Sequence, residues 1–157
     1  MVNPLIGIHA ALGEMGVSAF FWTFVEMIAP DKKRLRRAKV AAMLGVIFFF
    51  MSWVIGGYYY STDYGTDVKP VIKEGPQPWA HGVMMEAKEH IFLFLPFLGI
   101  VVFSLVSLAG ERMIKDAKLR KSFLIVTALV VLMGLAMAFM GYSISSGFRS
   151  ALEAGRT

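Results

Sequence analysis

Four apolar segments, each long enough to cross a lipid bilayer, constrain this chain more than any other feature of its sequence. A membrane-spanning helix needs about 20 predominantly apolar residues, because the hydrocarbon core is about 30 Å thick and each helical residue rises about 1.5 Å. Such segments run over about residues 5–29, 40–60, 91–109 (with a helical extension from about 79) and 123–144. They are too long for barrel strands. We therefore predict an all-α integral membrane four-helix bundle, in which residues 1–157 form one domain of two helical hairpins.

The composition excludes several classes of protein. Hydrophobic residues make up 57% of the chain and charged residues 17%, with a mean hydropathy of +0.62. A soluble domain has about 45–50% apolar and about 25% charged residues, so neither an ordinary soluble domain nor a disordered chain is expected. The chain has no cysteine. This excludes disulfides, iron–sulfur clusters, thiolate zinc sites, cysteine nucleophiles and covalently attached c-type haem.

The net charge of +5 reports the topology of the chain. Two segments between the apolar spans, PDKKRLRRAK and GERMIKDAKLRK, hold eleven of the sixteen Lys and Arg residues. By the positive-inside rule both loops are cytoplasmic, so both termini and the loop over residues 61–78 are outside. We expect a prokaryotic plasma-membrane protein whose basic loops contact lipid head groups, and no nucleic-acid partner. The outer loop contains Pro70, Pro76 and Pro78 and is expected to form an ordered, turn-rich cap.

Ionisable residues within or beside the spans are the candidate functional residues, because such groups are costly in a membrane. The three histidines are His9, His81 and His90. All of them lie in the outer half of the predicted membrane spans or just beyond it. Counting from the two basic loops places His9 and His90 at one depth, in the first and third spans. Imidazoles on facing helices commonly hold a b-type haem, so the predicted axial ligands are His9 and His90. His81 is the substitute if the third helix starts differently, because one helix cannot present both His81 and His90 to one point.

A carboxylate–histidine metal site is the alternative chemistry for these residues. Glu86 and His90 are four positions apart and share a helix face, and His9 and Glu14 lie in the first span. The spacing departs from the Glu-x-x-His pairs of di-iron bundles, which favours a mononuclear iron, copper or zinc site. A third alternative is that the histidines only bond to carbonyls or carboxylates, in a cofactor-free accessory subunit of a membrane complex.

Two further glutamates lie on the first span. Glu14 is about 8 Å deeper than His9 in a regular helix, where it is a candidate proton relay or a protonated carboxyl that bonds to another helix. Glu26 lies near the first basic loop. We expect it to pair with Lys32 or Lys33.

The layout resembles the small four-helix membrane cytochrome b proteins, including the haem-binding copper-resistance and protoporphyrinogen-oxidase-like groups. The matching features are the early His9, the basic hairpin PDKKRLRRAK, the Gly57-Tyr58 and Gly141-Tyr142 span ends, and His90 at the start of the third span. This resemblance implies haem b and electron transfer. We expect an electron-transfer subunit of an oxidoreductase at the outer face, within a respiratory or quinone-linked complex. Its expected partners are the lipid bilayer, other membrane subunits or an external cytochrome, and quinone.

Overall fold

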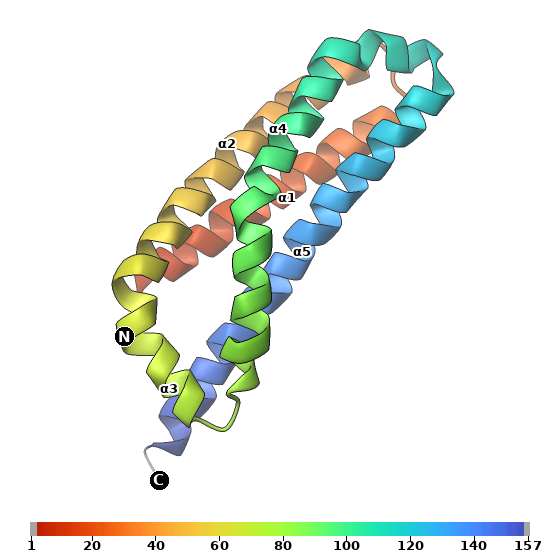
Figure 1. The fold of residues 1–157 in the computed structure, drawn as a ribbon. Coiled ribbons are helices and arrows are strands. Elements are labelled where there is room, and N and C mark those ends of the chain that lie inside the picture. The colour runs from red at the N-terminus through yellow and green to blue at the C-terminus, as the bar shows by residue number, and fades with distance from the viewer. Residues whose placement is uncertain (1–2, 156–157) are drawn as a thin grey trace.

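The computed structural model describes residues 3–155, which fold entirely into helices and short connections (Figure 1). This confirms the all-helical class and the four long apolar helices, each of which is long and apolar enough to cross a membrane. The long helices are α1 (Pro4–Ile28), α2 (Lys32–Tyr59), α4 (Glu86–Lys115) and α5 (Ala117–Ala154). Between α2 and α4 lie the π-helical segments η1 (Tyr60–Val68) and η2 (Ala80–Met85) and the short helix α3 (Lys69–Glu74).

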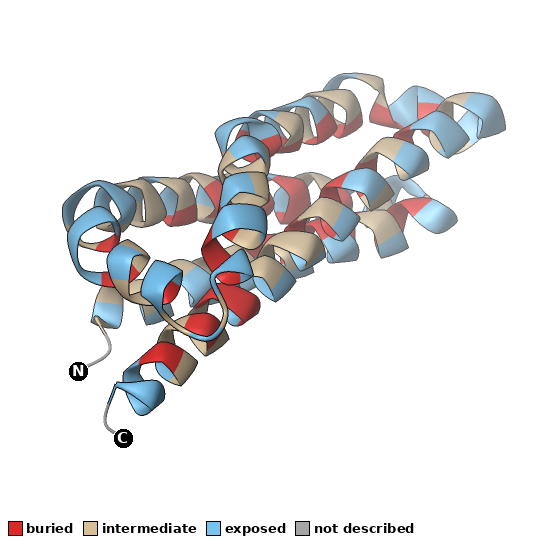
Figure 2. Ribbon diagram, turned by 60° about the horizontal axis from the view of Figure 1, so that its bottom comes forward, coloured by how far each residue is buried: buried red, intermediate tan, exposed pale blue. Residues whose placement is uncertain are grey.

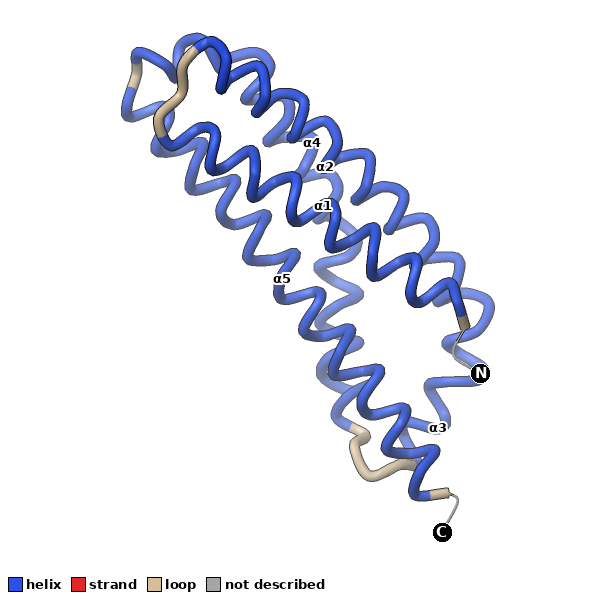
Figure 3. Tube along the Cα trace, turned by 180° about the vertical axis from the view of Figure 1, so that it is seen from behind, coloured by secondary structure: helices blue, strands red, loops and turns tan. Residues whose placement is uncertain are grey.

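The four long helices pack side by side in a ring. Helix α1 packs against α2 and α5, and α4 packs against the same two neighbours, so α1 and α4 lie diagonally across the bundle. The α1–α2 and α4–α5 turns lie at one end, which we call the basic end (Figures 1 and 3). The opposite end, which we call the terminal end, carries α3, the start of α1 and the end of α5 (Figures 1 and 3).

The basic segments form helix ends where loops were expected. Helix α2 begins at Lys32 because the Asp31 carboxylate accepts a hydrogen bond from the backbone N–H of Arg34 at 2.7 Å. Asp116 is the single non-helical residue between α4 and α5, and it accepts bonds from the first N–H groups of α5 at 2.9 and 3.0 Å. Most of the basic side chains therefore project from helical turns next to very short connections.

The core is built from aromatic rings that fill space left by glycines. Phe20 is fully buried, and a Cβ on Gly45 or Gly99 would lie within 3.0 Å of its ring. A Cβ on Gly16 would likewise lie 2.3 Å from Phe49, whose ring centroid is 5.1 Å from that of Phe20. Buried residues face inward between the helices, and exposed ones face outward (Figure 2).

The outer connection is helical where a turn-rich cap was expected. Segment η1 continues α2 without a break, and the hydroxyls of Ser61 and Thr62 donate to carbonyls four residues earlier, at 2.8 and 2.9 Å. Pro70 lies in the first turn of α3, where its missing N–H removes no helical bond. Pro96 is tolerated inside α4, which changes direction near its middle (Figure 1). The only non-helical part of this connection is residues 75–78.

Candidate functional site

A cavity of about 650 Å³ lies among the four long helices in the half of the bundle toward the terminal end. Its size is within the range of cofactor and small-molecule sites. Its walls are mostly apolar and aromatic, and its charged or titratable lining residues outside the tyrosines are His9, Glu14, Lys88, Glu89 and Arg149. The cavity could therefore hold a largely apolar ligand that also contacts a few charged or titratable side chains.

His9 lines this cavity with its ring orientation fixed by Ser52 of α2. The His9 Nδ1 lies 2.9 Å from the Ser52 carbonyl oxygen and 2.9 Å from the Ser52 hydroxyl. The same hydroxyl donates to the His9 carbonyl at 2.9 Å. Since a carbonyl oxygen only accepts, Nδ1 carries the proton. The lone pair of Nε2 is then available to a ligand or metal.

Glycines and aromatic rings shape the cavity around His9. A Cβ on Gly56 would lie 2.6 Å from the His9 ring, so the absence of a side chain there allows the imidazole to lie against α2. Gly13, Gly57, Gly134 and Gly141 also line the cavity. Trp53 and Phe92 are stacked, with centroids 5.7 Å apart and planes inclined by 17°. The Trp53 indole N–H is buried without a hydrogen-bond partner among residues 3–155.

His81, the substitute ligand of the sequence-based prediction, is part of a buried joint. It is 3% exposed, and its Nδ1 lies 3.1 Å from the Tyr64 hydroxyl. Its Nε2 lies 3.9 Å from a carboxylate oxygen of Glu86. The Tyr64 contact is the hydrogen bond of the ring within residues 3–155, and the residue joins η2 to η1 outside the cavity lining.

His90 lies apart from His9. Its side chain is exposed, its Nδ1 donates to the Glu86 carbonyl of its own helix at 2.6 Å, and it does not line the cavity. The structure therefore does not bring His9 and His90 together on this cavity.

The predicted metal-ligand carboxylates are also dispersed. Glu14 is exposed, and it lines both the cavity and a shallow groove between α1 and α2. Glu86 is 57% exposed at its side chain and faces His81. Within the described part of the chain, no three His, Asp or Glu side chains gather into a group that could hold a metal ion.

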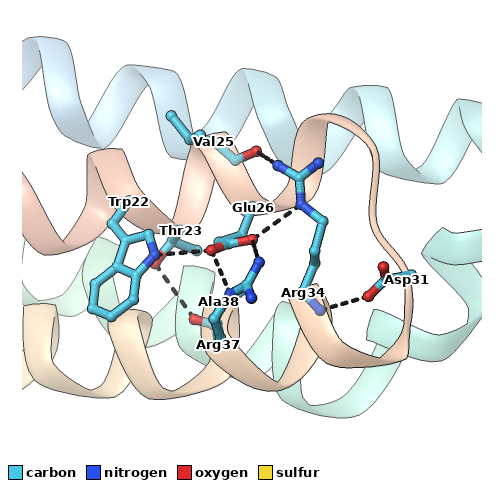
Figure 4. Close-up of polar contacts among 8 residues, drawn as sticks. All are labelled: Trp22, Thr23, Val25, Glu26, Asp31, Arg34, Arg37 and Ala38. Carbon is cyan, nitrogen blue, oxygen red and sulfur yellow. Dashed lines mark hydrogen bonds and ion pairs between the residues drawn. The ribbon is translucent and has the colours of Figure 1, made fainter.

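Glu26 forms a polar cluster at the basic end (Figure 4). Its carboxylate accepts bonds from Trp22 Nε1 at 3.0 Å, Arg34 Nε at 3.0 Å, and Arg37 Nε and Nη2 at 2.7 and 2.9 Å. Arg34 Nη2 also donates to the Val25 carbonyl at 2.7 Å, near the end of α1. The partners of Glu26 are thus arginines on the first turns of α2, and not the lysines expected from the sequence.

Two cations line the cavity, and sequence reasoning missed the second of them. Lys88 lies one turn before Phe92, and this spacing places both on the same face of α4. Arg149 lies beyond residue 144, where the fourth span was predicted to end, but α5 continues to Ala154.

No protein-family model, curated protein or solved structure matches this chain.

Proposed function

We propose that this protein is a membrane-embedded haem b protein that transfers electrons, with His9 as the axial ligand. One observation carries the proposal: the Nδ1–H of His9 is held by Ser52, while the ring borders a cavity large enough for a cofactor. Metal-binding histidines usually donate their second ring N–H to a carbonyl or carboxylate, which fixes the ring and the tautomer.

The lining of the cavity supports a flat, largely apolar ligand. The walls are mostly apolar, and the Trp53–Phe92 pair offers an aromatic surface. A single histidine ligand is a common way to hold haem iron. The proposal therefore uses His9 alone and leaves out the exposed His90.

Each residue has a separate role in this proposal. Ser52 orients the His9 ring, and Trp53 and Phe92 keep water from one side of the cavity. The bound haem would supply one-electron transfer. By the positive-inside rule the basic end is cytoplasmic, so the cavity lies in the outer half of the membrane, where a quinone-linked complex or an external cytochrome could exchange electrons with it.

Absorption spectroscopy of the purified protein tests the proposal. We expect the protein in detergent to bind haem with one-to-one stoichiometry, with a sharp Soret band and an α-band on reduction. His9→Gly should lose this spectrum, and added imidazole should restore it, which separates loss of the ligand from loss of the fold. His90→Ala is the matched control and should keep the spectrum.

The opposite results would assign another function. An unchanged Soret band in His9→Gly would remove His9 from the site. A wild-type protein without haem binding, but with stoichiometric iron, copper or zinc by elemental analysis, would indicate the non-haem alternative. A protein that holds neither would be a cofactor-free accessory subunit.

A further inference from the structure

We infer that Lys88 forms an anion subsite that binds the carboxylate of the ligand in the cavity. The inference rests on the proposed function, because it assigns the carboxylate to a haem propionate. It also makes a statement about the cavity that can be tested without haem.

The first observation is a cation without a counter-ion. Within residues 3–155 the Lys88 ammonium has no hydrogen bond and no ion pair, although Glu14 and Glu89 line the same cavity. The arginines that face Glu26 at the basic end are paired with its carboxylate. A charge in a mostly apolar cavity is normally paired, so an anionic group from outside the chain is the missing partner of Lys88.

The second observation is the direction of the Lys88 side chain. Its Nζ lies 3.2 Å from the position that a Cβ on Gly141 would occupy. The side chain therefore extends from α4 to α5, and Gly141 leaves the space that the ammonium uses. Arg149 lies about 12 Å further along α5, toward the terminal end, and lines the same cavity.

The third observation distinguishes Lys88 from the other lysines of the terminal end. Lys69 and Lys73 belong to α3, and neither lines the cavity. Lys88 shares the cavity with His9, so one ligand could contact both. A ligand with an apolar body and a carboxylate edge matches this arrangement of imidazole, apolar wall and ammonium.

A comparison of haem b with its dimethyl ester tests the subsite. The ester keeps the iron and the ring but lacks the propionate charges. We expect the wild-type protein to bind haem b at least about tenfold more tightly than the ester, since charge-assisted hydrogen bonds are stronger than neutral ones. Lys88→Gln should bring the two affinities within about threefold of each other, and Lys73→Gln should leave the wild-type ratio unchanged.

The ester also provides the control for folding. Lys88→Gln should bind the ester through His9 with the wild-type Soret band, which a misfolded variant would not do. A wild-type ratio in Lys88→Gln would overturn the inference while leaving the proposed function intact. Failure of the wild-type protein to bind either compound would overturn the proposed function.

A second probe reports on the subsite when haem is not used. Dibromostearate quenches tryptophan fluorescence, and Trp53 lines the cavity. Trp22 and Trp79 are exposed, so the assay uses a Trp22→Phe/Trp79→Phe background in which Trp53 is the remaining tryptophan. In micelles we expect this protein to be quenched at least about fivefold more efficiently by the acid than by its methyl ester, and Lys88→Gln in the same background to show no such preference. Equal quenching of the background protein by acid and ester would overturn the anion subsite.

Discussion

Phe20 is the side chain whose removal best tests how this bundle is packed. The residue is fully buried, and its ring lies against the backbones of Gly45 on the neighbouring helix α2 and Gly99 on the diagonal helix α4. Because lipid and detergent are as apolar as the core, loss of hydrophobic transfer contributes little in a membrane protein, and packing is the main term. Phe20→Ala therefore isolates the contribution of packing.

The expected size follows from the volume that is emptied. Replacing the phenyl ring by a methyl group removes about 100 Å³, and a residual cavity costs about 24 cal/mol per Å³. We expect Phe20→Ala to lower the free energy of unfolding by about 2.5 kcal/mol, which is about 60-fold in the equilibrium constant. Phe21 is 56% exposed, so Phe21→Ala is the matched control and should change it by less than about 0.5 kcal/mol.

The Gly45 contact gives a second, sharper expectation. A Cβ on Gly45 would lie 2.7 Å from the Phe20 ring, so Gly45→Ala should destabilise the wild-type protein by about 1–3 kcal/mol. In the Phe20→Ala background the same methyl group enters the emptied space. There, Gly45→Ala should be neutral or stabilising.

Unfolding by SDS in mixed micelles, followed by tryptophan fluorescence, measures all four proteins of this cycle. The reasoning is refuted if Phe20→Ala unfolds at the same SDS fraction as Phe21→Ala. It is also refuted if Gly45→Ala has the same effect in both backgrounds, since the two residues would then not share a contact.

Three other outcomes are expected. Glu26→Ala should lower the SDS midpoint more than Glu111→Ala, because only Glu26 joins α1 to α2 through arginines; equal midpoints would show that the cluster adds no stability. Asp116→Ala removes the N-cap of α5 and should cost about 1 kcal/mol in the same assay, whereas Asp116→Asn should keep most of the stability. Ser52→Ala removes the hydroxyl beside His9 and should weaken haem binding about tenfold in a spectroscopic titration, while stability in SDS falls by only about 1 kcal/mol, as for one hydrogen bond between α1 and α2; unchanged affinity would show that the carbonyl alone orients the ring.

The long helices could be predicted from the sequence, but their ends could not. Apolar length and the placement of Lys and Arg identify four helices and two hairpins. Helix α5 reaches Ala154, and α2 begins among its basic residues, because a helix continues into water wherever caps and packing allow it. Hydropathy carries no information about such polar turns.

For the candidate site, the sequence predicts how deep a residue lies in the bundle but not which way its side chain points. Chain position gives the depth of a residue along a helix, and His9 and His90 were assigned one depth on that basis. The direction of a side chain around the helix depends on packing, which the sequence pattern left open. Lys88 and Phe92 face the cavity, and His90 is about 200° around α4 from each of them. Because Phe92 faces the cavity, His90 must point away from it on the other side of α4.

The short turn at the basic end governs how the rest of the molecule can move. Only residues 29–31 separate α1 from α2, and the Glu26 cluster ties these helices together beside that turn. Helix α1 has 25 residues, so it is about 38 Å long, and a rotation of about 3° at the turn displaces its far end by about 2 Å. Because His9 and Ser52 also bond α1 to α2 toward the terminal end, such a rotation would have to break these contacts before a bulky molecule could enter there.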